Sequence, residues 1–139
     1  MTRVTGLAAT LSTFTNFVVY FVLGGILTAL FVLLYANLTP QRDITLIRAG
    51  NSAAAIALVG AILGFEVPLA SVIAHSAAII DVVVWGVVAL VVQLIGFLVA
   101  RMVLPFLPKA IEEGNIADAV LLAGISLALG ILSAACMAG

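Results

Sequence analysis

Four long apolar runs, almost free of charged residues, constrain the fold of this 139-residue chain more than any other feature. Phe17–Leu38 and Val82–Ala100 are nearly unbroken, and Ile116–Ala138 carries a single charged residue near its start. A helix needs about 20 residues to cross a hydrocarbon layer of about 30 Å, so each of these runs can span a bilayer. With 65% hydrophobic and 8% charged residues, the chain lies outside the range of water-soluble domains.

The fourth run, "GNSAAAIALVGAILGFEVPLASVIA", contains a glutamate and a proline. Its uncharged core, Ala53–Phe65, is too short to cross a bilayer, so we predict that the helix continues through Glu66 and Pro68. Proline lacks a backbone N–H, which predicts a kink and a free carbonyl near Gly64 that a neighbouring helix or water must satisfy. Glu66 is therefore expected at membrane depth, facing the inside of the bundle.

These runs predict a single all-α membrane domain, residues 1–139, with spans at about 15–38, 51–74, 79–101 and 115–138. The first and third connections hold most of the basic residues, and basic connections stay in the cytoplasm. Both termini are then expected outside, with Arg3 as an exception. Each basic connection is also predicted to hold a short interfacial helix, one opened by Thr39 and Pro40 and one by Pro108.

An internal repeat accounts for this layout. An offset of 64 residues aligns "IRAGNSAAAIALVGAILGFEVPLASVIA" with "IEEGNIADAVLLAGISLALGILSAACMA". We therefore predict two tandem two-helix hairpins that point the same way. In both copies a glycine precedes an asparagine, Asn51 or Asn115, which is expected to cap the next span and could also line a polar entrance.

Small residues repeat as well. At the offset of 64, Gly60 and Gly64 align with Gly124 and Ala128. Each pair forms a small-xxx-small pattern, which lets helix backbones approach closely in a membrane. The pattern is compatible with packing inside one bundle or between subunits. Helix faces formed by small residues occur so often in the four spans that they favour a homo-oligomer.

The few polar residues in the spans are the candidate sites. Glu66 is either a protonated, hydrogen-bonded acid, an acid near the external interface, or part of a hydrated path for a cation or proton. Gln93 is either an interhelical link or a selectivity element. Asp81 and Trp85 are residues typical of a helix end at the external boundary of the bilayer. His75 is expected in a loop or boundary on the same side, where a pH-sensing role is the alternative.

Several segments resemble the YjfL-type family of bacterial inner-membrane proteins, a domain of unknown function. They are "LTPQRDITLI", "GNSAAAIALVGAILGFEVPLAS", Asp81 with "WGVVALVVQLI", "ARMVLP" and "AACM". The resemblance covers nearly the whole chain after Tyr20 and implies a four-span protein of the bacterial inner membrane, often encoded near membrane-stress proteins. It implies no established activity. Glu66 departs from that family's pattern, so the resemblance assigns it no role.

The sequence offers no set of residues for catalysis, no metal-ligand spacing and no basic surface for nucleic acid, so we expect a non-enzymatic protein without metal or cofactor. Cys136, the single cysteine, is predicted to be buried and inert. One hypothesis is a small homo-oligomer in which Glu66, Gln93, Asn51 and Asn115 contribute to a polar path. The alternative is a non-transporting membrane scaffold that docks a cytoplasmic or membrane-stress protein through its basic connections.

Overall fold

The structure, a computed structural model, describes residues 2–38 and 43–138, and all of its regular elements in those ranges are helices. Four of them are long and apolar enough to cross a membrane, as predicted. The residues that were predicted to open the first short helix, Thr39 and Pro40, lie outside the described ranges. The helices are α1 (Thr2–Leu38), α2 (Asp43–Arg48), α3 (Ser52–His75), α4 (Ile79–Val103), α5 (Leu107–Glu112) and α6 (Ile116–Ala138).

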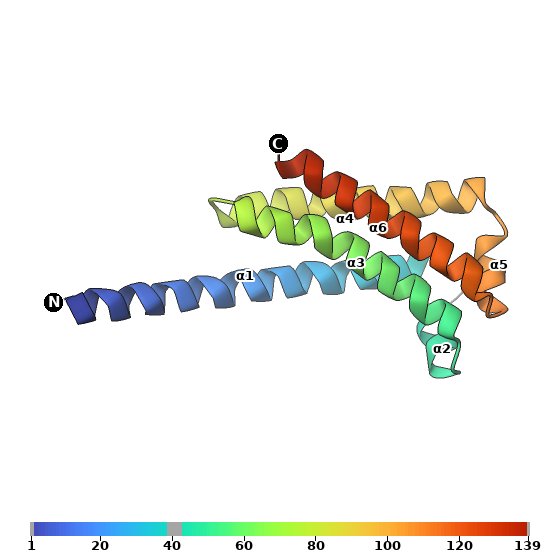
Figure 1. The fold of residues 1–139 in the computed structure, drawn as a ribbon, viewed down its shortest axis with the longest axis horizontal. Helices are drawn as coiled ribbons and strands as arrows, with labels where there is room; N and C mark the ends of the chain where they lie inside the picture. Colours follow the sequence, from blue (N-terminus) through green and yellow to red (C-terminus); the bar gives the residue numbers. More distant parts are fainter. Residues whose placement is uncertain (1, 39–42, 139) are drawn as a thin grey trace.

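The first helix is longer than the predicted span. It begins at Thr2 rather than near residue 15, and its 37 residues correspond to about 56 Å at 1.5 Å per residue. Its N-terminal half extends past the turn between α3 and α4 (Figure 1). Leu7, Leu11 and Phe14 in this half are all more than half exposed. The predicted span begins with the first continuous apolar run, but threonines and alanines continue the helix upstream.

The centre of the bundle is the crossing of α3 and α6, which form its most extensive helix–helix contact (Figure 1). Alanines and glycines bring the two backbones together here. Ala53, Ala57 and Ala61 of α3 and Ala119 of α6 are at most 2% exposed. Lipid offers no hydrophobic drive for helices to associate, so this contact depends on close packing of small side chains.

Aromatic rings join α1 and α4 to this pair. Phe31 of α1 stacks on Phe65 of α3 with ring centroids 4.8 Å apart, and Tyr35 of α1 meets Phe97 of α4 edge-on at 5.1 Å. Leu27 of α1 packs against Gly86 of α4, where an added Cβ would lie 2.8 Å from the leucine Cδ1. The C-terminal half of α1 is thereby attached to the bundle, unlike its N-terminal half.

The two short helices lie at the same end of the bundle, opposite both chain termini (Figure 1). Each ends in the same kind of turn. Gly50 and Gly114 have φ values of 89° and 84°, which favour glycine, and the following asparagine N–H donates at 2.9 Å to the carbonyl of Leu46 or Ala110, five residues earlier. The pattern Gly-Asn thus closes a short helix and starts a long one twice.

Candidate functional site at membrane depth

Pro68 creates an open acceptor in the middle of α3. It is buried inside the helix, and without an N–H it cannot bond to the carbonyl of Gly64, four residues earlier. Gln93 of α4 fills that place, because its Nε2 donates to Gly64 O at 2.8 Å and to Ser126 O of α6 at 3.2 Å. The expectation that a neighbouring helix satisfies the freed carbonyl is confirmed. Gln93, 4% exposed, therefore links three helices.

Glycines make room for this link. A Cβ added to Gly64 would overlap Ser126 O, and one added to Gly130 would overlap Gly64 O. Gly60 lies against Ala123 in the same way. The α3 and α6 backbones are thus in direct contact on both sides of the Gln93 amide.

Gly124 and Ala128, the matching small pair in the second half, do not contribute to this seam. Both are exposed, and nothing lies within 4 Å of the position that a Cβ on Gly124 would take. Of the two alternatives left open for this pair, packing inside the bundle is not seen at Gly124, and contact between subunits stays a prediction. The face of α6 that contacts α3 contains Ala123 and Gly130 instead, because neighbouring positions on a helix point about 100° apart.

Glu66 lies near the middle of α3 and meets α1. Its Oε1 is in hydrogen-bond contact with Oγ1 of Thr28, and both side chains are partly buried. Thr28 Oγ1 also donates to the carbonyl of Gly24, one turn earlier, at 2.9 Å. The acid therefore has a hydroxyl partner at depth rather than a basic one. Thr28 was not predictable as that partner, because no sequence pattern links a threonine in one span to an acid in another.

The two asparagines are helix caps at the end near α2 and α5. Asn51 Oδ1 accepts from Ala54 N at 3.1 Å, while its Nδ2 donates to the carbonyls of Ile111 and Glu112 at 3.0 and 3.2 Å. Asn51 thus attaches the end of α5 to the start of α3. Asn115 Oδ1 accepts from Asp118 N at 3.2 Å and the residue is exposed.

At the opposite end, the predicted outer-side residues come together. His75, at the end of α3, and Asp81 and Trp85, in the first turns of α4, line one pocket of about 260 Å³. His75 Nδ1 lies 2.8 Å from Ser71 O, and Ser76 Oγ donates to Ala78 O at 2.7 Å. The structure does not bring this pocket together with Asn51 or Asn115, which lie at the far end.

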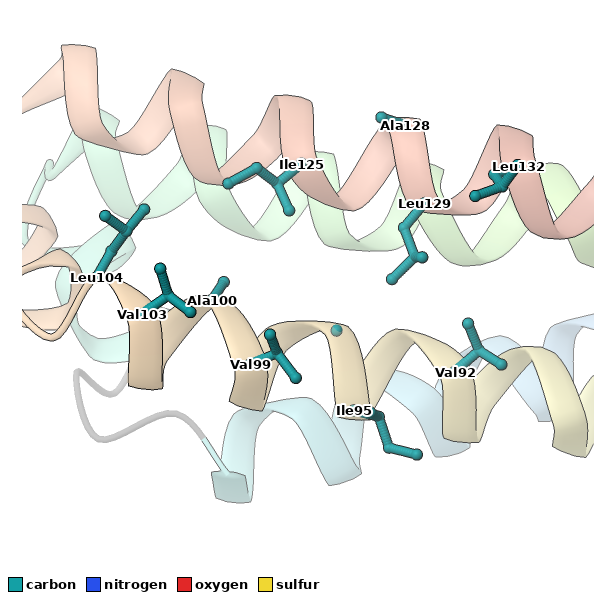
Figure 2. Close-up of a pocket in the computed structure, with 11 residues that line it drawn as sticks. Val92, Ile95, Val99, Ala100, Val103, Leu104, Ile125, Ala128, Leu129 and Leu132 are labelled. Atoms are coloured by element: carbon teal, nitrogen blue, oxygen red, sulfur yellow. The ribbon is translucent and has the colours of Figure 1, made fainter.

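A second groove, of about 700 Å³, runs between α4 and α6 (Figure 2). Its side chains come from apolar residues of the two helices, with no polar group among them. It suits a hydrocarbon chain or another helix and offers nothing to orient a polar ligand. The residues lining it are Val92, Ile95, Gly96, Val99, Ala100, Val103, Leu104, Ile125, Ala128, Leu129 and Leu132.

Cys136 is exposed near the end of α6, so the expectation that it is buried was wrong. Cysteine is often buried in soluble proteins, but α6 at this point has one face turned away from the bundle. Within residues 2–38 and 43–138, no three His, Cys, Asp or Glu side chains gather in a group that could hold a metal ion.

Comparison with known proteins places the chain among bacterial membrane proteins of unknown function. It is 36% identical over 121 residues to the inner membrane protein YjfL of Escherichia coli strain K12, a match that covers 87% of this chain and 92% of the relative. The protein of the same name from Escherichia coli O157:H7 matches equally well. No solved structure is significantly similar. Since the model of the family described as Domain of Unknown Function (DUF350) matches residues 8–137, the chain belongs to that family.

Proposed function

We propose that the protein is a non-enzymatic inner-membrane homo-oligomer with a polar path for a cation, a proton or a small solute. The observation that carries this proposal is the contact between Glu66 of α3 and Thr28 of α1. An acidic side chain is costly at membrane depth and is commonly retained there for ion or proton pathways. The Glu66 carboxyl is only partly buried by the single chain, so it remains accessible to a path along α1.

The contact can exist in two arrangements that differ by one proton. A threonine hydroxyl has one hydrogen, yet Thr28 has two acceptors within reach, Gly24 O and Glu66 Oε1. If Glu66 carries a proton, the carboxyl donates to Thr28 while Thr28 donates to Gly24 O. If Glu66 is ionised, the hydroxyl turns to the carboxylate and releases Gly24 O. Proton uptake then needs only the rotation of one hydroxyl.

The remaining polar residues take narrower roles in this proposal. The amide of Gln93 is engaged by two carbonyls and the side chain is buried, which favours the interhelical link over a selectivity element. Asn51 and Asn115 are caps at the end with α2 and α5, where they can border an entrance but not the middle of a path. Glu66 is left as the one ionisable group in the proposed path.

We also propose that the chain is a tandem repeat and that it assembles with copies of itself. The bounds of α2 and α5 differ by 64 residues, and so do the first residues of α3 and α6, which is the offset found in the sequence. Only 17% of the most apolar window of α1 is buried by the single chain. Gly124 and Ala128 lie on an open face of α6, where they can support close contact with a neighbouring subunit.

Flux measurements in liposomes test the path. Glu66→Gln keeps the side-chain shape but removes the ionisable group, so we expect the cation or proton flux of the wild-type protein to be lost or strongly changed. Thr28→Val removes the hydroxyl partner and is expected to alter the same flux. Thr15→Val is the matched control, since its hydroxyl also donates one turn back, to Leu11 O, but it faces no acid. Inserted wild-type protein that passes no ion or small solute under any gradient would refute the path.

A second candidate function, a membrane scaffold, is favoured by the surface around α2 and α5. Lys109, Glu112 and Glu113 are exposed there, at the end proposed to face the cytoplasm. We propose as its partner a cytoplasmic protein, such as a membrane-stress protein, that docks on these charges. Lys109→Glu is expected to abolish partner capture if the scaffold is the function and to leave flux unchanged if the path is. Equal partner capture by the wild-type protein and the Lys109→Glu variant counts against the scaffold.

A further inference from the structure

The pocket at the α3–α4 turn is lined mostly by residues with polar side-chain atoms. Of its seven lining residues, five carry a polar atom in the side chain, whereas the α4–α6 groove has none. Its volume of about 260 Å³ suits a group of a few heavy atoms and lies just below the range of drug-sized sites. The lining residues are Ser71, Val72, His75, Ser76, Asp81, Trp85 and Met137.

Asp81 gives the pocket a negative charge without a positive partner. Its carboxyl is half-buried, and no basic side chain among the described residues pairs with it. Arg48, Arg101 and Lys109 belong to the opposite end of the bundle, where α2 and α5 lie. A carboxylate held in a recess without a fixed counter-charge attracts a mobile cation.

The neighbouring polar groups present acceptors to that cation. The Ser71 carbonyl can only accept, so the 2.8 Å contact puts a hydrogen on His75 Nδ1, and in that tautomer of the imidazole Nε2 is an acceptor. Ser76 Oγ uses its hydrogen for Ala78 O, and its lone pairs remain available. Together with Asp81, these atoms suit a ligand that brings several N–H donors.

Trp85 makes the pocket better suited to an organic ammonium group than to a metal ion. An indole ring attracts ammonium groups through its π face but supplies no ligand to a metal. It lies one turn after Asp81 on α4 and lines the same pocket. No group of three metal-binding side chains occurs in the described ranges.

We propose that this pocket binds a primary ammonium group. Asp81 supplies the charge, His75 and Ser76 accept N–H hydrogen bonds, and Trp85 packs against the cation. Two sources share this chemistry, namely a small water-soluble amine and the ethanolamine headgroup of a membrane lipid. The inference does not depend on the proposed path, because binding at this end requires no passage through the bundle.

Trp85 makes the test direct, because it is the single tryptophan of the chain and its fluorescence reports on the pocket. The full-length protein is placed in nanodiscs of phosphatidylcholine and phosphatidylglycerol and titrated with ethanolamine at constant ionic strength. A saturable change in Trp85 emission is expected. In a second arm, nanodiscs with phosphatidylethanolamine show the altered emission before any addition if the lipid is the source, and an unaltered emission if the free amine is.

Asp81→Asn should weaken ethanolamine binding at least tenfold, since it removes the only charge in the pocket. Asp118→Asn is the matched control, because Asp118 is also the third residue of a long helix but lies at the opposite end of the bundle. Should Asp81→Asn fail to fold, His75→Ala provides a second variant at an exposed position, expected to weaken binding severalfold. A wild-type protein that responds to neither ammonium source, or an Asp81→Asn variant that folds and binds as tightly as wild type, overturns the proposal.

Discussion

The link between Gly64, Gln93 and Pro68 makes a quantitative prediction about stability. Gln93→Met keeps an unbranched side chain of similar length but removes both donated hydrogen bonds, to Gly64 O and Ser126 O. Ser126 O keeps an in-helix donor, because α6 continues to Ala138. Gly64 O has none, because residue 68 is proline.

The two losses differ in size for this reason. Hydrogen bonds between helices in membranes average about 0.6 kcal/mol and reach about 1.7 kcal/mol, which covers the bond to Ser126. Leaving the Gly64 carbonyl buried without a donor costs about 1–3 kcal/mol. Gln93→Met should therefore destabilise the bundle by about 2–5 kcal/mol in total.

A double-mutant cycle isolates the larger contribution. Pro68→Ala returns an N–H to α3, which can donate to Gly64 O when Gln93 is absent. In that background Gln93→Met should cost only about 0.6–1.7 kcal/mol, so the coupling between the two positions is expected to be at least about 1 kcal/mol.

Reversible unfolding in mixed micelles, followed by circular dichroism, measures all four proteins. Ile95→Met serves as the control, because Ile95 lies on the same helix, is 53% exposed and should change stability by less than about 0.5 kcal/mol. An equal cost of Gln93→Met with proline and with alanine at position 68 refutes the argument that the proline creates the need for the amide.

Two further predictions concern packing and topology. Gly130→Ala should destabilise the protein strongly, since its Cβ would overlap the Gly64 carbonyl, whereas Gly124→Ala should be tolerated because nothing lies nearby; thermal stability compares them. In a cysteine-free background, single cysteines at Ser76 and Gln41 should be labelled from the periplasm and the cytoplasm respectively. Labelling of the Ser76 position only from the cytoplasm would reverse the proposed orientation.

Features that depend on local chemistry were predictable from the sequence. The long apolar runs identified the four spans, and proline at position 68 identified a free carbonyl near Gly64. Asn51 and Asn115 were assigned as caps because Gly-Asn before an apolar run has a specific backbone consequence. In each case one segment contains both the cause and the result.

Features that depend on how helices face one another were not predictable in the same way. The proposed repeat aligns Gly124 with Gly60, yet Gly60 packs against Ala123 while nothing lies near Gly124. Identical residues at a fixed offset do not determine how each helix is rotated about its own axis. The hydroxyl partner of Glu66, the carbonyl on α6 that accepts from Gln93 and the exposure of Cys136 depend on the same unspecified rotation.

The proposed repeat is conspicuously unequal in its polar residues, and this bears on how a path could form. At the offset of 64, Glu66 corresponds to Gly130, Pro68 to Leu132 and Gln93 to Ala29. The second copy thus has neither the acid nor the freed carbonyl, and its glycine at position 130 instead provides room for the backbone of the first copy. One chain therefore presents an acid on one side only, against α1. A path enclosed by polar groups then requires other subunits to supply the remaining sides, so the permeation hypothesis and the homo-oligomer depend on each other.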